Sequence, residues 1–149
     1  MSPLQESALN LVTIYHNPHC ATSRNTLALI RNAGIEPEII EYLETPPTLS
    51  QLRALIDHAG LTVRQAIREK DTPFKELGLD DVTLSDDALL SAMLTTPLLI
   101  NRPFVVTATG TRLCRPSERV LKILDTPQQN PFSKEDGEIV IDRTGKRAR

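Results

Sequence analysis

A cysteine in a polar turn is the residue of this sequence best placed for chemistry. Cys20 follows the turn at residues 15–19 and precedes an apolar, helix-favouring stretch, so a helix is expected to begin at Cys20. A thiol there lies among unpaired backbone N–H groups and near the positive end of the helix dipole. Such placement lowers the pKa of a cysteine from ~8.5 to about 3.5–7.5. Because the thiolate is the reactive form, we predict that Cys20 is a nucleophile.

Polar neighbours of Cys20 are expected to support this role. Thr22 and Ser23 carry hydroxyl groups that can donate to the sulfur, and His16 can add positive charge from the preceding turn. In the alternative interpretation, Cys20 is a small buried hydrophobic residue and Ser23 only caps the helix. This alternative is weaker, because a cysteine in a polar turn gains little from burial.

The elements around Cys20 predict a β-α-β unit. The apolar run at residues 11–15 is typical of a strand, and the helix that begins at Cys20 is expected to end at Gly34. A second strand is predicted at residues 38–43. Two strands joined by a helix in this way lie parallel, with a right-handed crossover.

The middle of the chain, residues 48–96, predicts an all-helical insertion. Thr48 is followed three residues later by a glutamine, which is the pattern of a capping box, and Ser85 is expected to cap a later helix. Shorter helices are predicted at residues 61–68 and at residues 73–77.

The remainder returns to strands. Residues 104–107 and 111–114 predict a hairpin, and Pro116 is expected to open a closing helix. Residues 127–149 are predicted to be mostly irregular, with one weak strand-like run at residues 139–141. The fold class is therefore α/β, with a small mixed sheet and the element order β-α-β, helical insertion, β-β-α. Cys20 lies at the carboxyl end of the first strand, which is where ligands bind in open α/β sheets.

The composition is typical of a soluble globular protein. The chain has 149 residues, of which 40% are hydrophobic and 24% charged, and its net charge of −2 implies no general affinity for nucleic acid. No run of about 18 apolar residues predicts a membrane span. We predict an N-terminal extension at residues 1–10, without the features of a secretory signal, and a single domain at residues 11–149. Two cysteines and no export signal indicate the cytoplasm.

Four segments form a specific combination with the Cys-x-x-Ser motif that starts at Cys20. They are YHNPHCATSRN (15–25), YLETPP (42–47), LLINRP (98–103) and GTRLCRPSE (110–118). Together they resemble the glutathione- and glutaredoxin-coupled bacterial arsenate reductases, which have a thioredoxin-like fold and serve arsenical resistance and detoxification. The resemblance extends from about Leu11 to residues 132–137.

The resemblance implies roles for individual residues. Cys20 corresponds to the catalytic cysteine and His16 to the histidine that tunes the thiol. Three arginines correspond to those that bind arsenate, namely Arg68, Arg102 and Arg115. Asn17 and Ser23 belong to the same motif as supporting residues, and Pro103 corresponds to the cis-proline that faces the thiol in thioredoxin-like folds. The family usually has a small residue before the cysteine, where this chain has a histidine.

The residue types support an oxyanion site independently of the resemblance. Guanidinium groups pair with tetrahedral oxyanions through two parallel hydrogen bonds and remain charged. Arg102 and Arg115 flank the predicted hairpin, each directly before a proline, near the sheet edge that carries Cys20. Arg68 comes from the insertion, which would then act as a lid. Any one of these arginines alone would be read as a surface charge.

The expected mechanism is nucleophilic. Cys20 attacks arsenic and forms a thiol–arsenate adduct. Cys114 is predicted to point away from the site, because it alternates with Arg115 along a strand. The reducing thiols then come from outside, from glutathione as co-substrate and then from glutaredoxin. We predict no bound cofactor and no metal ligands.

Two other functions remain open at this point. A general glutathione-dependent thiol oxidoreductase of the same fold would need Cys20 but not the three arginines. A non-enzymatic thioredoxin-like regulator would commonly carry a second cysteine where this chain has Ser23. A phosphatase-like arsenate reductase is not favoured, because no Cys-x5-Arg loop starts at Cys20.

Overall fold

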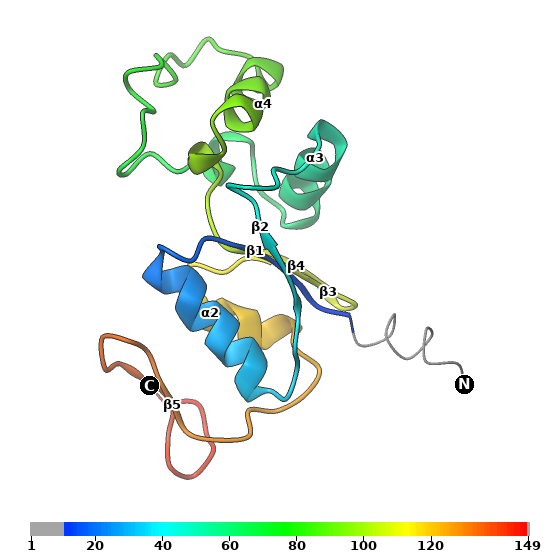
Figure 1. Cartoon of the computed structure of the whole chain (residues 1–149), viewed down its shortest axis with the longest axis vertical. Coiled ribbons are helices and arrows are strands. Elements are labelled where there is room, and N and C mark those ends of the chain that lie inside the picture. Colours follow the sequence, from blue (N-terminus) through cyan, green and yellow to red (C-terminus); the bar gives the residue numbers. More distant parts are fainter. Residues whose placement is uncertain (1–10, 149) are drawn as a thin grey trace, which may run out of the picture.

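A four-stranded mixed sheet forms the centre of the structure (Figure 1). The computed structural model describes residues 11–148, so the predicted N-terminal extension at residues 1–10 lies outside the described residues. The strands are β1 (Thr13–His16), β2 (Glu38–Glu41), β3 (Phe104–Thr107) and β4 (Gly110–Leu113). Their order is β2-β1-β3-β4, with β1 parallel to β2 and antiparallel to β3. The predicted β-α-β unit and the β3–β4 hairpin are both confirmed.

Helix α2 (Ala21–Asn32) joins β1 to β2 and covers one face of the sheet (Figure 1). Cys20 is its N-cap, and Gly34 follows its end with a φ of 78°. The closing element on this face, η3 (Ser117–Ile123), is a 3-10 helix and not the expected α-helix. Its buried residues recur every third position, which matches the three-residue turn of a 3-10 helix. Among residues 11–148, no helix is long and apolar enough to cross a membrane.

The insertion lies on the other side of the sheet from α2 (Figure 1). It contains helices α3 (Leu49–His58) and α4 (Asp86–Thr95), with the Thr48 capping box and the Ser85 cap both formed as predicted. The helix predicted at residues 61–68 is reduced to the short 3-10 helix η1 (Arg64–Ala66).

Pairing with the loop before β3 explains the short η1. Ile67 forms an isolated β-bridge with Ile100, and the Arg68 N–H donates to the Leu99 carbonyl at 2.7 Å. These backbone groups are therefore unavailable to a longer helix. The same loop contains the 3-10 helix η2 (Pro97–Leu99). The helix predicted at residues 73–77 forms only a turn, in which the Leu77 N–H donates to the Pro73 carbonyl at 3.0 Å.

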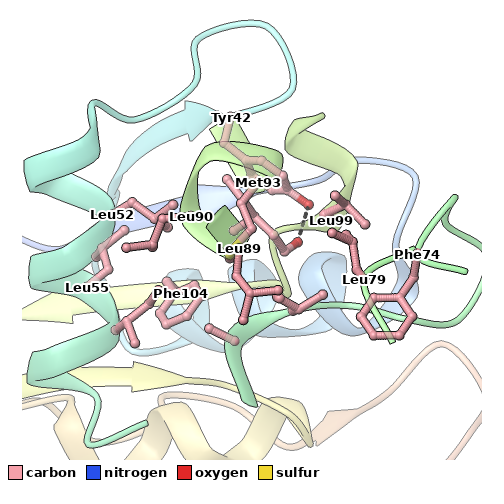
Figure 2. Packing of buried hydrophobic residues seen from close by; sticks show 14 residues of the cluster. Tyr42, Leu52, Leu55, Phe74, Leu79, Leu89, Leu90, Met93, Leu99 and Phe104 are labelled. Carbon is pink, nitrogen blue, oxygen red and sulfur yellow. Dashed lines mark hydrogen bonds between the residues drawn. The ribbon is translucent and has the colours of Figure 1, made fainter. Parts of the chain in front are cut away.

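Successive side chains of β3 point to opposite faces of the sheet, and the buried apolar residues form two clusters, one on each face. Phe104 packs with the insertion, and Val105 packs with α2 and η3 on the opposite face. Figure 2 shows the insertion-side cluster, in which Leu89 of α4 and Phe104 lie among other fully buried side chains. The insertion is therefore fixed to the sheet by a continuous apolar core.

The C-terminal segment is more ordered than the sequence predicts. Strands β5 (Phe132–Ser133) and β6 (Ile139–Ile141) form a separate two-stranded sheet, of which only the second strand was indicated by the sequence. Val140 and Ile141 are buried in the α2-side cluster. Tertiary contacts with α2 thus order a segment whose local sequence is weak in strand character.

Truncation of the insertion core should destabilise the protein. Leu89 is completely buried, so Leu89→Ala should lower the free energy of unfolding by ~2–5 kcal/mol through lost burial and cavity formation. Leu77 is 49% exposed, and Leu77→Ala should change it by less than about 0.5 kcal/mol. Urea unfolding of both variants measures the difference, and equal effects would contradict the described packing.

Candidate active site

A tight turn presents Cys20 at the start of α2. The Cys20 N–H donates to the Asn17 carbonyl at 3.1 Å, which closes the turn that contains Pro18 and His19. The Asn17 side chain reinforces it, because its Oδ1 accepts from the His19 N–H at 2.9 Å. His19 is exposed, whereas Cys20 is partly buried. The turn thus leaves the thiol reachable from one side while fixing its backbone.

The surroundings of Cys20 favour the thiolate. Burial raises the pKa of its thiol, but the backbone N–H of Ser23 and the guanidinium groups of Arg102 and Arg115 lower it by more. The net pKa therefore lies below the ordinary value of a cysteine. This agrees with the expected effect of the helix start, to which the structure adds two arginines.

His16 acts differently from the sequence prediction. Its Nδ1 lies 2.6 Å from the Ser23 hydroxyl oxygen, which also accepts from the Asn17 N–H at 3.1 Å. The Ser23 hydroxyl is therefore engaged with His16, and the serine backbone, not its hydroxyl, stabilises the sulfur of Cys20. Burial is the main reason that the pKa of His16 is lowered, which disfavours the charged ring. This works against the positive charge that the sequence predicts for His16, and its contact with Ser23 supports the turn.

Two of the predicted arginines, Arg102 and Arg115, lie beside the Cys20 sulfur. Arg115 Nη1 lies 3.6 Å from Cys20 Sγ and donates to the Arg102 carbonyl at 3.0 Å. Arg102 is only 9% exposed, and its peptide bond to Pro103 is cis, as the sequence predicts. The loops before and after the β3–β4 hairpin therefore converge on the start of α2.

The third predicted arginine joins the same group. The pKa of Arg68 is lowered, first by burial and then by the positive charges of Arg115 and Arg102. Because the Ile67–Ile100 bridge fastens Arg68 to the loop before β3, the insertion is attached directly beside the site.

The arginines have unused capacity for hydrogen bonding. The Nε atoms of Arg68 and Arg102 are buried without a hydrogen-bond partner among the described residues. Within residues 11–148, no carboxylate forms a salt bridge with Arg68, Arg102 or Arg115. A buried unpaired donor costs about 1–3 kcal/mol, and more when it is charged. Three clustered guanidinium groups therefore favour an anion that accepts their hydrogen bonds beside the sulfur.

Cys114 lies away from this group, as predicted. It is completely buried in the α2-side cluster, and burial raises its pKa to about 12. Its thiol is therefore a packed core group at neutral pH. In the part of the chain that the structure describes, no three His, Cys, Asp or Glu side chains are grouped so that they could bind a metal.

Comparison with known proteins places this arrangement in a family. A sequence profile of the ArsC family matches residues 15–123. The chain belongs to the ArsC family. It is 68% identical over 136 residues to "Arsenate reductase" of Rhizobium meliloti (strain 1021), covering 91% of this chain and 97% of that protein. It is 59% identical to "Arsenate reductase" of Escherichia coli (strain K12), again over 136 residues, covering 91% of this chain and 96% of that protein.

A solved structure agrees with this fold. "Arsenate reductase from Vibrio cholerae" superposes with a TM-score of 0.73 and 51% identity, covering 76% of this chain and 98% of that chain. The fold is therefore the thioredoxin-like α/β fold that the sequence predicts.

Tyr42 is a residue of this ArsC-family site that sequence reasoning missed. The Asn17 side-chain amide donates to the Tyr42 hydroxyl at 3.5 Å. That hydroxyl donates to the Ile100 carbonyl at 3.4 Å, and this bond is dashed in Figure 2. Tyr42 thereby links the Cys20 turn to the loop that carries Arg102. Its place in the motif YLETPP was visible in the sequence, but its partners are distant along the chain.

The two thiols should differ sharply in reactivity. Cys20 should be alkylated by iodoacetamide at pH values below the ordinary cysteine pKa, because its thiolate persists as the pH falls, whereas buried Cys114 should not react in the folded protein. Mass spectrometry of the alkylated protein across a pH series identifies the modified residue and its apparent pKa. An apparent pKa of Cys20 at or above ~8.5 would contradict the described surroundings.

Proposed function

We propose that this chain is an arsenate reductase that converts arsenate to arsenite through a thiol–arsenate adduct on Cys20. Glutathione and glutaredoxin are the external reductants. The observation that carries the proposal is the pair of buried Nε donors of Arg68 and Arg102, which have no partner in the described part of the chain and lie beside a thiol of lowered pKa. The names of the similar ArsC-family proteins support arsenate as the anion.

Arsenate suits the charge and geometry of the arginines. It is a tetrahedral oxyanion with one to two negative charges near neutral pH, and guanidinium groups donate to such oxygens in parallel pairs. Arg68 and Arg102 offer free Nε donors, and Arg115 reaches the sulfur itself. Neutralisation of the anion by these groups lets the Cys20 thiolate approach arsenic with less repulsion.

The covalent step is a displacement at arsenic. The Cys20 sulfur forms a bond to arsenic, and one As–O bond breaks, with its oxygen leaving as water or hydroxide. Reduction of the arsenic by two electrons then requires two thiols. Glutathione and a glutaredoxin thiol supply this pair of electrons and end as a mixed disulfide, while Cys20 is released as a thiol. Arsenite is mostly neutral at pH 7, so the arginines lose their attraction for the product.

The need for external thiols follows from the position of Cys114. Its burial in the core and its pKa of about 12 keep it from attacking an adduct on Cys20. Both cysteines are free. We propose that the protein acts in the reducing cytoplasm, where both thiols stay reduced and glutathione is available.

The cysteines should contribute unequally to turnover. Cys20→Ser should abolish arsenate reduction, because the nucleophile is lost, whereas Cys114→Ala should keep most of it. Arsenate-dependent NADPH oxidation, coupled through glutathione reductase with and without glutaredoxin, measures both variants. Loss of activity in Cys114→Ala equal to that in Cys20→Ser would point to an internal disulfide and against the external-thiol mechanism.

The arginines separate arsenate reduction from general thiol reduction. Loss of a hydrogen bond to a charged group costs ~1.5–3 kcal/mol, so Arg102→Ala and Arg115→Ala should each lower arsenate kcat/KM by roughly ten- to a hundredfold. Lysine retains the charge but loses the planar fork, so Arg102→Lys and Arg115→Lys should also be impaired. Arg68→Lys also loses a free Nε donor, but it should be less affected, because Arg68 is only partly buried and lysine retains its charge.

An exposed arginine on η3 gives the matched control. Arg119→Ala should leave arsenate kinetics unchanged, since Arg119 lies outside the group around Cys20. Wild-type arsenate kinetics in both Arg102→Ala and Arg115→Ala would favour a general thiol oxidoreductase, for which a neutral mixed disulfide needs no arginines. An absence of turnover in the wild-type protein would favour a regulator.

A further inference from the structure

Arg24 connects the turn at residues 17–20 (the Cys20 turn) to the antiparallel pair of β5 and β6 with its connecting loop (the C-terminal hairpin). Its Nη1 donates to the Pro18 carbonyl at 2.8 Å, inside the turn that presents Cys20. Its Nε and Nη2 donate to the two carboxylate oxygens of Glu135 at 2.8 and 2.9 Å. One side chain thus fastens a backbone atom two residues before Cys20 to a segment more than one hundred residues later in the chain.

The far end of this connection is itself anchored. The Glu135 N–H donates at 3.1 Å to the side chain of Asn25, which is buried in α2. The neighbouring Lys134 pairs with Glu118 of η3 at 2.8 Å, and both side chains are nearly nine-tenths buried. These contacts hold the backbone around Glu135 in place. Because Glu135 accepts two parallel hydrogen bonds from Arg24, it also determines the direction of the Arg24 guanidinium.

We propose that Arg24 is a positioning residue, which, oriented by Glu135, fixes the Pro18 carbonyl and thereby the direction of the Cys20 sulfur toward the arginine group. This proposal rests on the proposed function for its kinetic consequence, but the positioning itself concerns the thiol. The C-terminal hairpin then contributes to the site through Glu135, although it is distant from Cys20 along the chain.

A second ion pair, between α2 and the loop that follows it, shows why stability alone does not explain Arg24. Arg31 and Glu36 form the same bidentate arrangement, at 2.9 and 3.0 Å, and are similarly exposed. Exposed ion pairs contribute little to stability, so neither pair is expected to matter much for folding. Arg24 differs in its additional bond to a carbonyl of the Cys20 turn.

The charge of Glu135 separates positioning from simple electrostatics. Arg102, Arg115 and Arg24 place positive charge near the Cys20 sulfur, whereas Glu135 carries negative charge. If only charge mattered, Glu135→Gln would lower the pKa of Cys20, because a negative charge is removed. If Glu135 orients Arg24, the same change loosens the turn and raises the pKa, as Arg24→Gln does. The two explanations predict opposite signs.

The experiment compares Arg24→Gln and Glu135→Gln with the matched variants Arg31→Gln and Glu36→Gln. Each full-length protein is alkylated by iodoacetamide across a pH series to obtain the apparent pKa of Cys20, and arsenate kcat and KM are measured. Arg24→Gln and Glu135→Gln should raise the pKa and lower kcat by about tenfold, with KM within about twofold because the anion-binding arginines are unchanged. The matched variants should behave as wild type, and the double variant Arg24→Gln/Glu135→Gln should be no worse than Arg24→Gln.

Two results would overturn the proposal. One is a lowered pKa of Cys20 in Glu135→Gln, which would assign the effect to charge alone. The other is equality of Arg24→Gln and Arg31→Gln in both readouts. If the wild-type protein does not turn over arsenate, the proposed function fails, while the alkylation series still decides whether Arg24 positions the thiol.

Discussion

Electrostatic attraction between a thiolate and partly or fully buried guanidinium groups is the interaction on which the site depends. Arg68, Arg102 and Arg115 repel one another, and the first two keep buried Nε donors that have no partner within residues 11–148. Such an arrangement is unfavourable unless the fold enforces it. The thiolate of Cys20 offsets part of the positive charge, and an oxyanion beside it offsets more. The remainder of the structure can be understood as the framework that brings these charges together.

Three loops form that framework at one edge of the sheet. The turn after β1 presents Cys20, the loop before β3 carries Arg102, and the segment after β4 carries Arg115. Tyr42 joins the first two loops through weak hydrogen bonds, and the Ile67–Ile100 bridge adds the insertion. The apolar cores on the two faces of the sheet stabilise these connections, since each loop begins or ends at a strand that packs against one of the cores.

The two cysteines show how environment decides the chemistry of one residue type. Cys20 lies at a helix start beside two guanidinium groups, which outweigh the cost of its partial burial. Cys114 is surrounded by apolar side chains, and burial raises its pKa to about 12. A difference of this kind separates a nucleophile from a core residue at neutral pH. It also makes the enzyme that we propose dependent on thiols from other molecules.

Local sequence determined the β-α-β unit, the hairpin, both helix caps of the insertion and the position of Cys20 at a helix start, because turns, caps and apolar periodicity depend on neighbours within a few residues. The motif resemblance likewise indicated Arg68, Arg102 and Arg115. Only the tertiary structure decided that His16 is disfavoured as a cation, since its burial depends on distant segments. The tertiary structure also decided how short η1 is, through the pairing with Ile100, and that β5 forms at all, through packing against the α2-side cluster. The bond from Arg24 to Glu135 spans the chain, and no local pattern encodes a contact between residues so far apart.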